Sequence, residues 1–187
     1  MQANLAALQG RMKVVAIKEN IALVPFADVV YGCDADWWIA VQGLPGYAGL
    51  KVAYDPALVN HPDWGIRLIE IRPTDDRILT EPKGTVGSGG NSAFHAFNLA
   101  VQWGVDRVLL IGVDCNARNG IHWYGSARDV GRLVDPDEDN FRRWRRAFAE
   151  SAQILMRLGV DVRCASADSD LPFQLASVDE ALSEWAL

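Results

Sequence analysis

The stretch GSGGNSAFHAFNLAVQWGVDRVLLIGVDC, residues 87–115, decides how this chain is expected to fold. A glycine-rich loop runs into a helix, the helix into an apolar strand, and the strand ends on Asp114. Glycine allows turns that other residues resist, and Asn91 or Ser92 can cap the helix that follows. Because open α/β sheets bind their ligands at the carboxyl ends of strands, Asp114 is expected at the ligand-binding edge of the sheet.

The start of that helix is the first candidate for a binding site. Free amides at the start of a helix attract anions, and phosphates above all. We therefore predict that a nucleotide or another phosphorylated small molecule is bound by Gly87, Ser88, Gly89, Gly90, Asn91 and Ser92. The alternative is a tight strand-to-helix connection with a good cap. The loop is not a P-loop, because no Gly-Lys-Ser or Gly-Lys-Thr follows it.

Size and composition place the chain among ordinary globular proteins. Its 187 residues are 50% hydrophobic and 22% charged, which predicts a single α/β domain over residues 1–187. The net charge of −6 makes nucleic acid an unlikely partner. Apolar runs such as VLLIGV are too short to cross a bilayer and the first residues lack a signal-peptide core, so no membrane partner is expected. The three cysteines form no CxxC pair, which favours a reducing cytoplasm over a disulfide framework or a zinc site.

Strands and helices alternate along the sequence. Apolar runs predict strands at 13–17, 27–34, 51–54, 66–71, 107–113 and 160–166. Caps and helical spacing predict helices at 3–10, 36–41, 91–103, 138–158 and 177–185. Residues 72–86 are interpreted as a polar connection, and the loop at 115–140 has the length of functional or mobile loops. This alternation predicts a mostly parallel sheet with helices on both faces.

Acidic residues at strand ends are the next candidates. Asp114 directly follows an apolar strand and can bind a ribose hydroxyl, a metal or a reacting group, so we predict a catalytic role for it. Asp34 ends an earlier strand and is predicted to contact the nucleotide. With Asp36 nearby, these carboxylates could hold Mg²⁺ through phosphate oxygens and water. The alternatives are a loop brace at Asp114 and a helix N-cap at Asp34 or Asp36, so we assign no metal ligands and leave Mg²⁺ open.

Histidines and arginines complete the candidates. His122, in GIHWYGS, suits proton transfer because imidazole exchanges protons near neutral pH, and it is predicted as the second catalytic residue. The alternative for His122 is a surface position with packed aromatic neighbours. For His95, inside the helix after the glycine-rich loop, a packed or exposed position is favoured over one in the pocket. The arginines between positions 142 and 146 are interpreted as a solvated helix face balanced by the preceding acids, rather than as a phosphate contact.

Most of the chain resembles proteins of phages and prophages. The resemblance is carried by the stretch 87–115 with IHWYGS, by VVAIKENIALVPFADVVYGCDADWW, and by RCASADSDLPFQLASVDEAL. That group is similar to the 6-hydroxymethylpterin diphosphokinase-like domains and, more distantly, to bacterial sialyltransferases that use a cytidine-monophosphate sugar donor. The resemblance implies a Rossmann-like three-layer fold, a nucleotide site, and a role for His122 as a base or leaving-group contact. We add Asn116 and Tyr124, which lie beside the two predicted catalytic residues, to the predicted nucleotide-binding residues.

One part of the family pattern is missing. Such proteins usually begin with a strand and a Gly-x-Gly-Pro-Ser-like loop, and no such motif precedes Met12. We therefore expect that the fold can lack its first strand and one wall of the nucleotide site, and that the unpaired strand edges invite association, including homo-oligomers. Two functions stay open: a nucleotide-dependent transferase of the glycosyl- or diphosphotransferase type, and a non-catalytic phage accessory or oligomeric binding protein that retains the fold.

Overall fold

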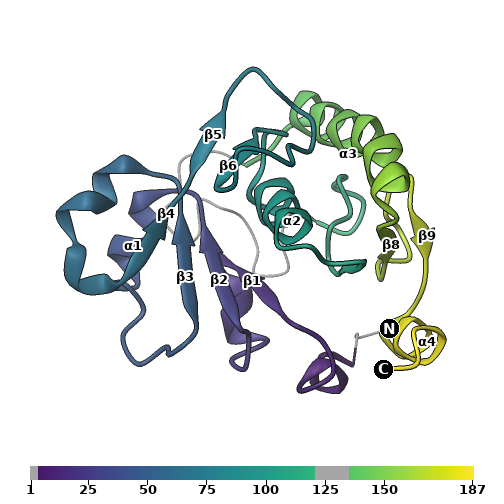
Figure 1. Ribbon diagram of the computed structural model, residues 1–187, viewed down its shortest axis with the longest axis horizontal. Coiled ribbons are helices and arrows are strands. Elements are labelled where there is room, and N and C mark those ends of the chain that lie inside the picture. The colour runs from purple at the N-terminus through teal and green to yellow at the C-terminus, as the bar shows by residue number, and fades with distance from the viewer. Residues whose placement is uncertain (1–3, 121–134) are drawn as a thin grey trace.

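The computed structural model describes residues 4–120 and 135–187 and contains three sheets (Figure 1). The first sheet consists, in spatial order, of β1 (Val15–Ile17), β2 (Val29–Gly32), β3 (Leu50–Ala53) and β4 (Ile66–Leu68). The second pairs β5 (Glu70–Arg72) with β6 (Thr85–Gly87). The third consists of β7 (Arg107–Leu110), β8 (Asp161–Cys164) and β9 (Gln174–Leu175). Every pair of these strands is parallel, which confirms the predicted parallel α/β architecture.

The helices begin and end close to the predicted positions. The α-helices are α1 (Ala35–Ala40), α2 (Ser92–Gln102), α3 (Glu138–Leu158) and α4 (Val178–Glu184). Short 3₁₀ helices are η1 (Leu5–Leu8), η2 (Lys18–Ala22), η3 (Pro56–Asn60) and η4 (Pro62–Trp64). The start of α3 is fixed by a capping box between Asp137 and Asn140, and its end by Gly159, whose φ of 71° favours glycine.

The first sheet is covered on both faces, as β2 shows. Val30 belongs to the apolar cluster that contains Trp38 of α1, whereas Tyr31 belongs to the cluster that contains Leu99 of α2. Because successive side chains of a strand point to opposite faces, this division places the sheet between α1 and α2. The result is the predicted arrangement of three layers.

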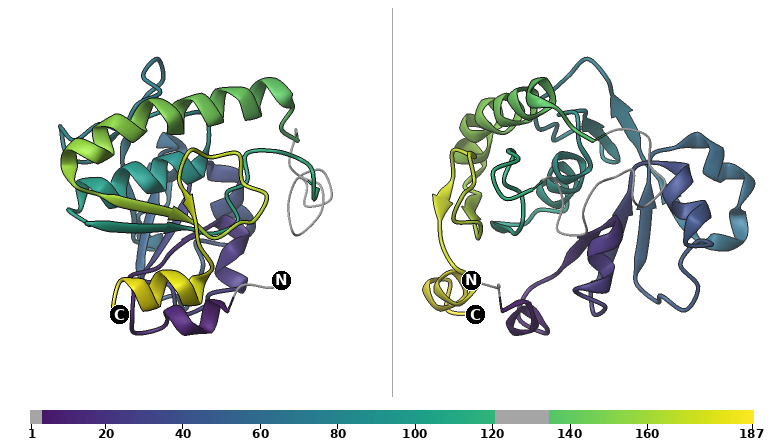
Figure 2. Two further views of the ribbon diagram at one scale, coloured as in Figure 1. Left: turned by 90° about the vertical axis from the view of Figure 1, so that its right-hand side faces the viewer. Right: turned by 180° about the vertical axis from the view of Figure 1, so that it is seen from behind.

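Helix α2 forms the centre of the molecule because two of its faces are apolar. One face packs on the first sheet, and the other meets α3, which lies across it in Figure 2. On that second face the ring centroids of Phe94 and Phe97 lie 5.2 Å and 5.6 Å from that of Phe148 in α3. These contacts hold the amino end of α2, and with it the glycine-rich loop, between the first sheet and α3.

The third sheet is also covered on both faces, and it brings the two ends of the chain together. Leu110 of β7 shares a cluster with Phe148, while the neighbouring Leu109 packs against the cluster of Leu182 in α4. Leu8 of η1 belongs to that same cluster, so η1 lies beside α4 (Figure 1).

Two of the edge strands in the described residues, β1 and β7, have the apolar sequence of central strands. Within residues 4–120 and 135–187, β1 pairs only with β2, and β7 pairs only with β8. Both strands are apolar in the manner of central strands, and side chains such as Val15 and Leu109 are only half-buried. This arrangement leaves the backbone groups on one side of each strand unpaired within the described residues.

Three details of the strand prediction were wrong. The alternating run at 66–71, predicted as one half-exposed edge strand, is divided at Ile69 into β4 and β5, which belong to different sheets. Strand β6 lies inside and just beyond the predicted polar connection, and β9 was not predicted at all. Strands of two or three residues are too short to produce a readable alternation.

Candidate functional site

Parallel strands bring several polar side chains to their carboxyl ends. Lys18 follows β1, Asp34 lies two residues beyond β2, and Ser88 follows β6. Asp114 lies four residues beyond β7, in the third sheet. This is the sheet edge at which α/β proteins bind ligands, and most of the predicted site residues lie there.

The glycines of the predicted phosphate loop are needed for packing. A Cβ on Gly87 would lie 2.0 Å from the Arg77 carbonyl oxygen, and one on Gly89 would lie 2.2 Å from the ring of Phe94. The side chain of Asn91 caps α2 by accepting a hydrogen bond from the Phe94 amide at 2.8 Å. The tight strand-to-helix connection with a good cap, given above as the alternative to a phosphate loop, is therefore present. At the start of α2 the amides of Ser92 and Ala93 make no hydrogen bond to the described residues.

An internal carboxylate already occupies one side of this loop. Asp76 accepts two hydrogen bonds from Arg143, at 2.9 Å from Nε and 2.8 Å from Nη2. Arg143 lowers the pKa of Asp76, and the Gly89 backbone amide acts in the same direction by hydrogen bonding to it. The Ser88 amide donates to the Asp75 carbonyl at 2.7 Å. The amides of Gly87, Ser88 and Gly89 are therefore satisfied within the protein, and the donors without a hydrogen bond to the described residues lie at the start of α2 and just before it.

The arginines of α3 take two roles. Arg142 pairs with Asp139 at 2.9 Å on the surface, as expected for a solvated face. For Arg143 that interpretation is wrong, because it binds Asp76 and also donates to Ser88 Oγ at 3.2 Å. Trp144 donates from Nε1 to the Gly90 carbonyl at 2.9 Å. The interior side of α3 therefore holds the glycine-rich loop in place through direct contacts.

A polar stripe runs along the buried side of α2 at His95, Asn98 and Gln102. Asn98 accepts hydrogen bonds from the Leu79 and Gly87 amides, both at 3.0 Å, and donates to the Leu79 carbonyl at 2.7 Å. Gln102 accepts one hydrogen bond and donates two in the same way. Every polar atom of these two amides is thus partnered, as is usual for buried polar groups.

His95 is the exception in this stripe. Its side chain is packed, as favoured from the sequence, and the residue is only 5% exposed. Nδ1 lies 3.0 Å from the hydroxyl of the fully buried Tyr31, but Nε2 has no hydrogen-bond partner. Within the described part of the chain, no other buried side-chain nitrogen or oxygen lacks one. An unpartnered buried nitrogen in a native site calls for a physical explanation.

Burial keeps His95, Tyr31 and the nearby Cys33 uncharged at neutral pH. Burial lowers the pKa of His95 to about 4, while the Ser88 backbone and Asp34 act in the opposite direction. Burial also raises the pKa of Tyr31, with a smaller effect from the neighbouring Cys33. Burial and Asp34 raise the pKa of the Cys33 thiol to about 11. All three groups therefore carry no charge at neutral pH, and no thiolate nucleophile is present here.

Asp34 has a role that the sequence did not show. The N-cap interpretation was wrong, because its carboxylate makes no capping hydrogen bond and instead pairs with Lys18. The amide of Ala35 at the start of α1 is bound by Asp55 at 3.1 Å. Asp34 remains exposed beside the His95 neighbourhood and influences the pKa of that ring. Lys18 carried no motif that would have marked it.

Asp114 and Asn116 lie in a separate network. The Asp114 carboxylate accepts a hydrogen bond from Ser166 Oγ, and its carbonyl oxygen accepts one from the Asp170 amide at 3.0 Å. Asn116 donates to the Asp168 carbonyl at 2.8 Å. Among described residues, no hydrogen bond or ion pair joins either side chain to the glycine-rich loop.

That network matches the loop-brace alternative for Asp114. The other predicted catalytic residue, His122, and the predicted ligand contact Tyr124 lie outside the described residues.

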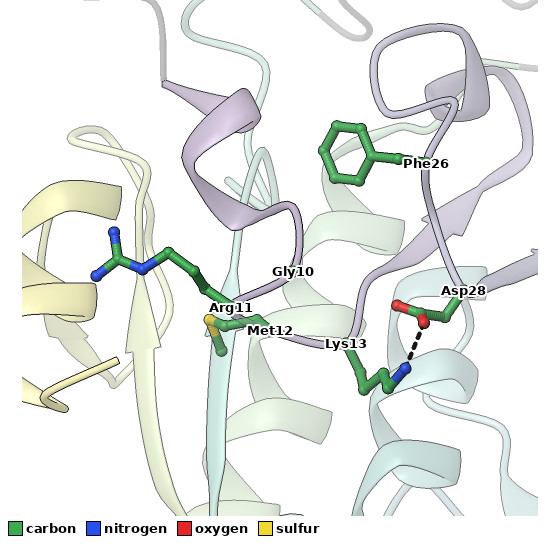
Figure 3. Close-up of a pocket in the computed structure, with 6 residues that line it drawn as sticks. All are labelled: Gly10, Arg11, Met12, Lys13, Phe26 and Asp28. Atoms are coloured by element: carbon green, nitrogen blue, oxygen red, sulfur yellow. Dashed lines mark hydrogen bonds and ion pairs between the residues drawn. The ribbon is translucent and has the colours of Figure 1, made fainter.

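Two hollows on the surface of the described residues are lined by other side chains. One, of about 210 Å³, lies at the amino ends of β1 and β2 and is lined by Gly10, Arg11, Met12, Lys13, Phe26 and Asp28 (Figure 3). Lys13 pairs with Asp28 at 2.7 Å, and Arg11 points away from them and donates to the Leu187 carbonyl. The other, of about 310 Å³, is lined by Tyr54, Pro56, Leu68, Ile69, Glu70 and Ile71. Neither contains a predicted site residue.

Comparison with known proteins gives no match to a family model, a curated protein or a solved structure. Within residues 4–120 and 135–187, no group of three or more His, Cys, Asp or Glu side chains is placed to hold a metal ion. None of the helices formed by these residues has the length and apolar character needed to cross a membrane.

Proposed function

We propose that this protein binds a nucleotide or another phosphorylated small molecule at the amino end of α2, as expected of a transferase-like Rossmann protein. The observation that carries the proposal is the buried, unpartnered Nε2 of His95, a residue of the same first turn of α2 whose Ser92 and Ala93 amides have no hydrogen bond to the described residues. A helix start favours anions through its free N–H groups and its dipole. The position on the carboxyl edge of parallel strands supports the same assignment.

Each neighbouring group has a role in this proposal. The amides of Ser92 and Ala93 bind phosphate oxygens, and the glycine-rich loop with the Asn91 cap holds them in position. The exposed carboxylate of Asp34 is free on its solvent side to accept a ribose hydroxyl, while Lys18 balances its charge. Asp114 and His122 remain the proposed pair for group transfer.

A nucleotide panel tests the proposal directly. The purified chain is titrated with AMP, CMP, GMP, UMP and pyrophosphate in isothermal calorimetry, with thermal shift as a second readout. Binding by at least one probe is expected, and Asn91→Ala should weaken it, because loss of the cap costs about 0.5–2 kcal/mol at the helix start. Asn119→Ala is the matched control, because Asn119 is exposed and its side chain binds Asp168, away from the glycine-rich loop. Absence of binding by all five probes refutes the proposal.

A second candidate function rests on the unpaired edges of β1 and β7. An oligomeric or accessory binding protein would use such edges, because unpaired strands readily bind another chain. Light scattering across a concentration series separates the candidates. A monomer that binds nucleotide favours the first, whereas a stable oligomer without nucleotide affinity favours the second.

A further inference from the structure

The unpartnered nitrogen of His95 lies where ligand and protein would meet. His95 is the fourth residue of α2, and helical side chains lean toward the amino end of their helix. The Ser88 backbone acts on the ring as a hydrogen-bond acceptor would and raises its pKa, although Nε2 has no partner within ordinary hydrogen-bond geometry. All polar side-chain atoms of Asn98 and Gln102 on the same stripe have hydrogen-bond partners. Of the three stripe residues, only His95 has a polar atom without one.

The partner of Nδ1 decides which nitrogen carries the proton. The Tyr31 hydroxyl lies 3.0 Å from Nδ1, and the two rings meet edge to face at 76°. The neighbouring Cys33 offers Tyr31 only a weak sulfur acceptor, whereas an imidazole nitrogen is a strong one. The Tyr31 O–H therefore donates to Nδ1, and a neutral ring must carry its own proton on Nε2.

We infer that the Nε2–H of His95 is a neutral hydrogen-bond donor to a phosphoryl oxygen of the ligand, and that Tyr31 is the positioning residue that holds the proton there. This inference rests on the proposed function and names the chemistry that the site recognises. Nε2–H and the amides of Ser92 and Ala93 are a set of donors that have no acceptor in ordinary hydrogen-bond geometry among the described residues. Such a set matches an oxyanion with several lone pairs, and the start of a helix favours its charge.

The two cationic side chains near the His95 ring are already paired with carboxylates. Arg143 is bound to Asp76, and Lys18 is bound to Asp34. Cys33 and Tyr31 are neutral, for the reasons given above. Because His95 stays unprotonated from about pH 5.5 to about pH 8, its contribution to binding should not be lost as the pH rises over that range. A protonated histidine would contribute strongly at the acidic end and lose its contribution as the pH rises.

The first experiment observes the proton in the free protein. Two-bond ¹H–¹⁵N spectra of the full chain, uniformly labelled with ¹⁵N, identify the tautomer of each histidine, and His95→Gln assigns the His95 signals. The expected result is the Nε2–H form with no titration between about pH 5.5 and pH 8. An Nδ1–H form, or a titration midpoint near about 6.5, overturns the inference. In Tyr31→Phe the tautomer should no longer be fixed, an effect that loss of packing alone would not cause.

The second experiment measures binding of the same five probes by the wild type and three variants. His95→Asn keeps an acceptor for Tyr31 but lacks the outer nitrogen, and should weaken the tightest probe about tenfold to a hundredfold. His95→Gln places an N–H donor near the position of Nε2 and should recover most of that loss. The control is His61→Asn, which removes a loop histidine stacked on Trp64, with ring centroids 3.8 Å apart, and should leave affinity unchanged.

The outcomes separate the inference from the proposed function. If the wild type binds a probe and His95→Asn binds it equally well, the inference falls while the proposed function stands. If the wild type binds none of the probes, both fall. The affinity ratio between wild type and His95→Asn should not fall between about pH 5.5 and about pH 8, because the donor stays neutral while the phosphate gains charge, and a ratio that collapses as the pH rises refutes the neutral donor. Should His95→Asn fail to fold, the spectra of the wild type and Tyr31→Phe still decide the question.

Discussion

Asn98 connects α2 to the glycine-rich loop, and its removal should destabilise the whole fold. The side chain is fully buried and accepts hydrogen bonds from the Gly87 and Leu79 amides while donating to the Leu79 carbonyl. In Asn98→Ala that carbonyl keeps its bond from Gln102 at 2.9 Å, so two amides lose their partner. An unsatisfied buried donor costs about 1–3 kcal/mol, and less where water can reach it, as at the half-buried Leu79. We therefore expect the free energy of unfolding to fall by about 2–4 kcal/mol.

Urea unfolding followed by circular dichroism measures this change. In a chain of this size the melting temperature should fall by about 4–16 °C. Hydrogen exchange of the Gly87 amide should accelerate more than that of amides in β2. Asn119→Ala removes the same side chain from an exposed position and should change stability by less than about 0.5 kcal/mol. A loss below about 1 kcal/mol in Asn98→Ala would show that water replaces the lost partners and that the stripe does not hold the loop.

Three further changes test other parts of the structure. Gly89→Ala should cost about 1–3 kcal/mol or more in urea unfolding, because φ is 50° and the new Cβ would lie 2.2 Å from the ring of Phe94; an unchanged stability would contradict the loop geometry. The folded-state pKa of Asp76 is lowered, so its ion pair stabilises the protein above the unfolded pKa of about 3.9 and is lost as the pH falls through the folded value. Asp76→Asn should therefore lower the free energy of unfolding at neutral pH, and that free energy should fall less steeply on acidification than in the wild type. An identical fall on acidification in both proteins would count against the ion pair of Asp76 with Arg143. The amides of Val15 and Ile17 should exchange faster than those of β2, and strong protection would reveal a strand paired to β1 from another chain.

The stretch at 87–115 shows why the fold was predictable. Its glycines, the Asn91 cap and the apolar run of β7 are local signals, and each acts through the backbone of its own segment. Helix α3 was equally clear, because Asp137 and Gly159 mark its ends by capping chemistry. By contrast, Ile69 divides a continuous alternating run between two sheets, and nothing within that run marks the division.

The sequence alone predicted only some residues of the candidate site. Residues 87–92 were identified because a loop before a helix has a recognisable pattern, but Asp76 and Arg143 were not, since they meet the loop from segments far away in the chain. Tyr31 offered one weak signal, as the single polar side chain in an apolar strand. His95 was expected to be packed, and only the structure shows that one of its two nitrogens lacks a partner.

By itself the sequence determined the parallel α/β class, the order of most helices and strands, and the loop before α2, because propensity, capping and turn chemistry act over a few neighbouring residues. The tertiary structure decided which strands pair, where the edges of β1 and β7 remain open, and which groups surround His95. Those features depend on contacts between residues distant in the chain, such as the bond between His95 and Tyr31, and local pattern does not encode them.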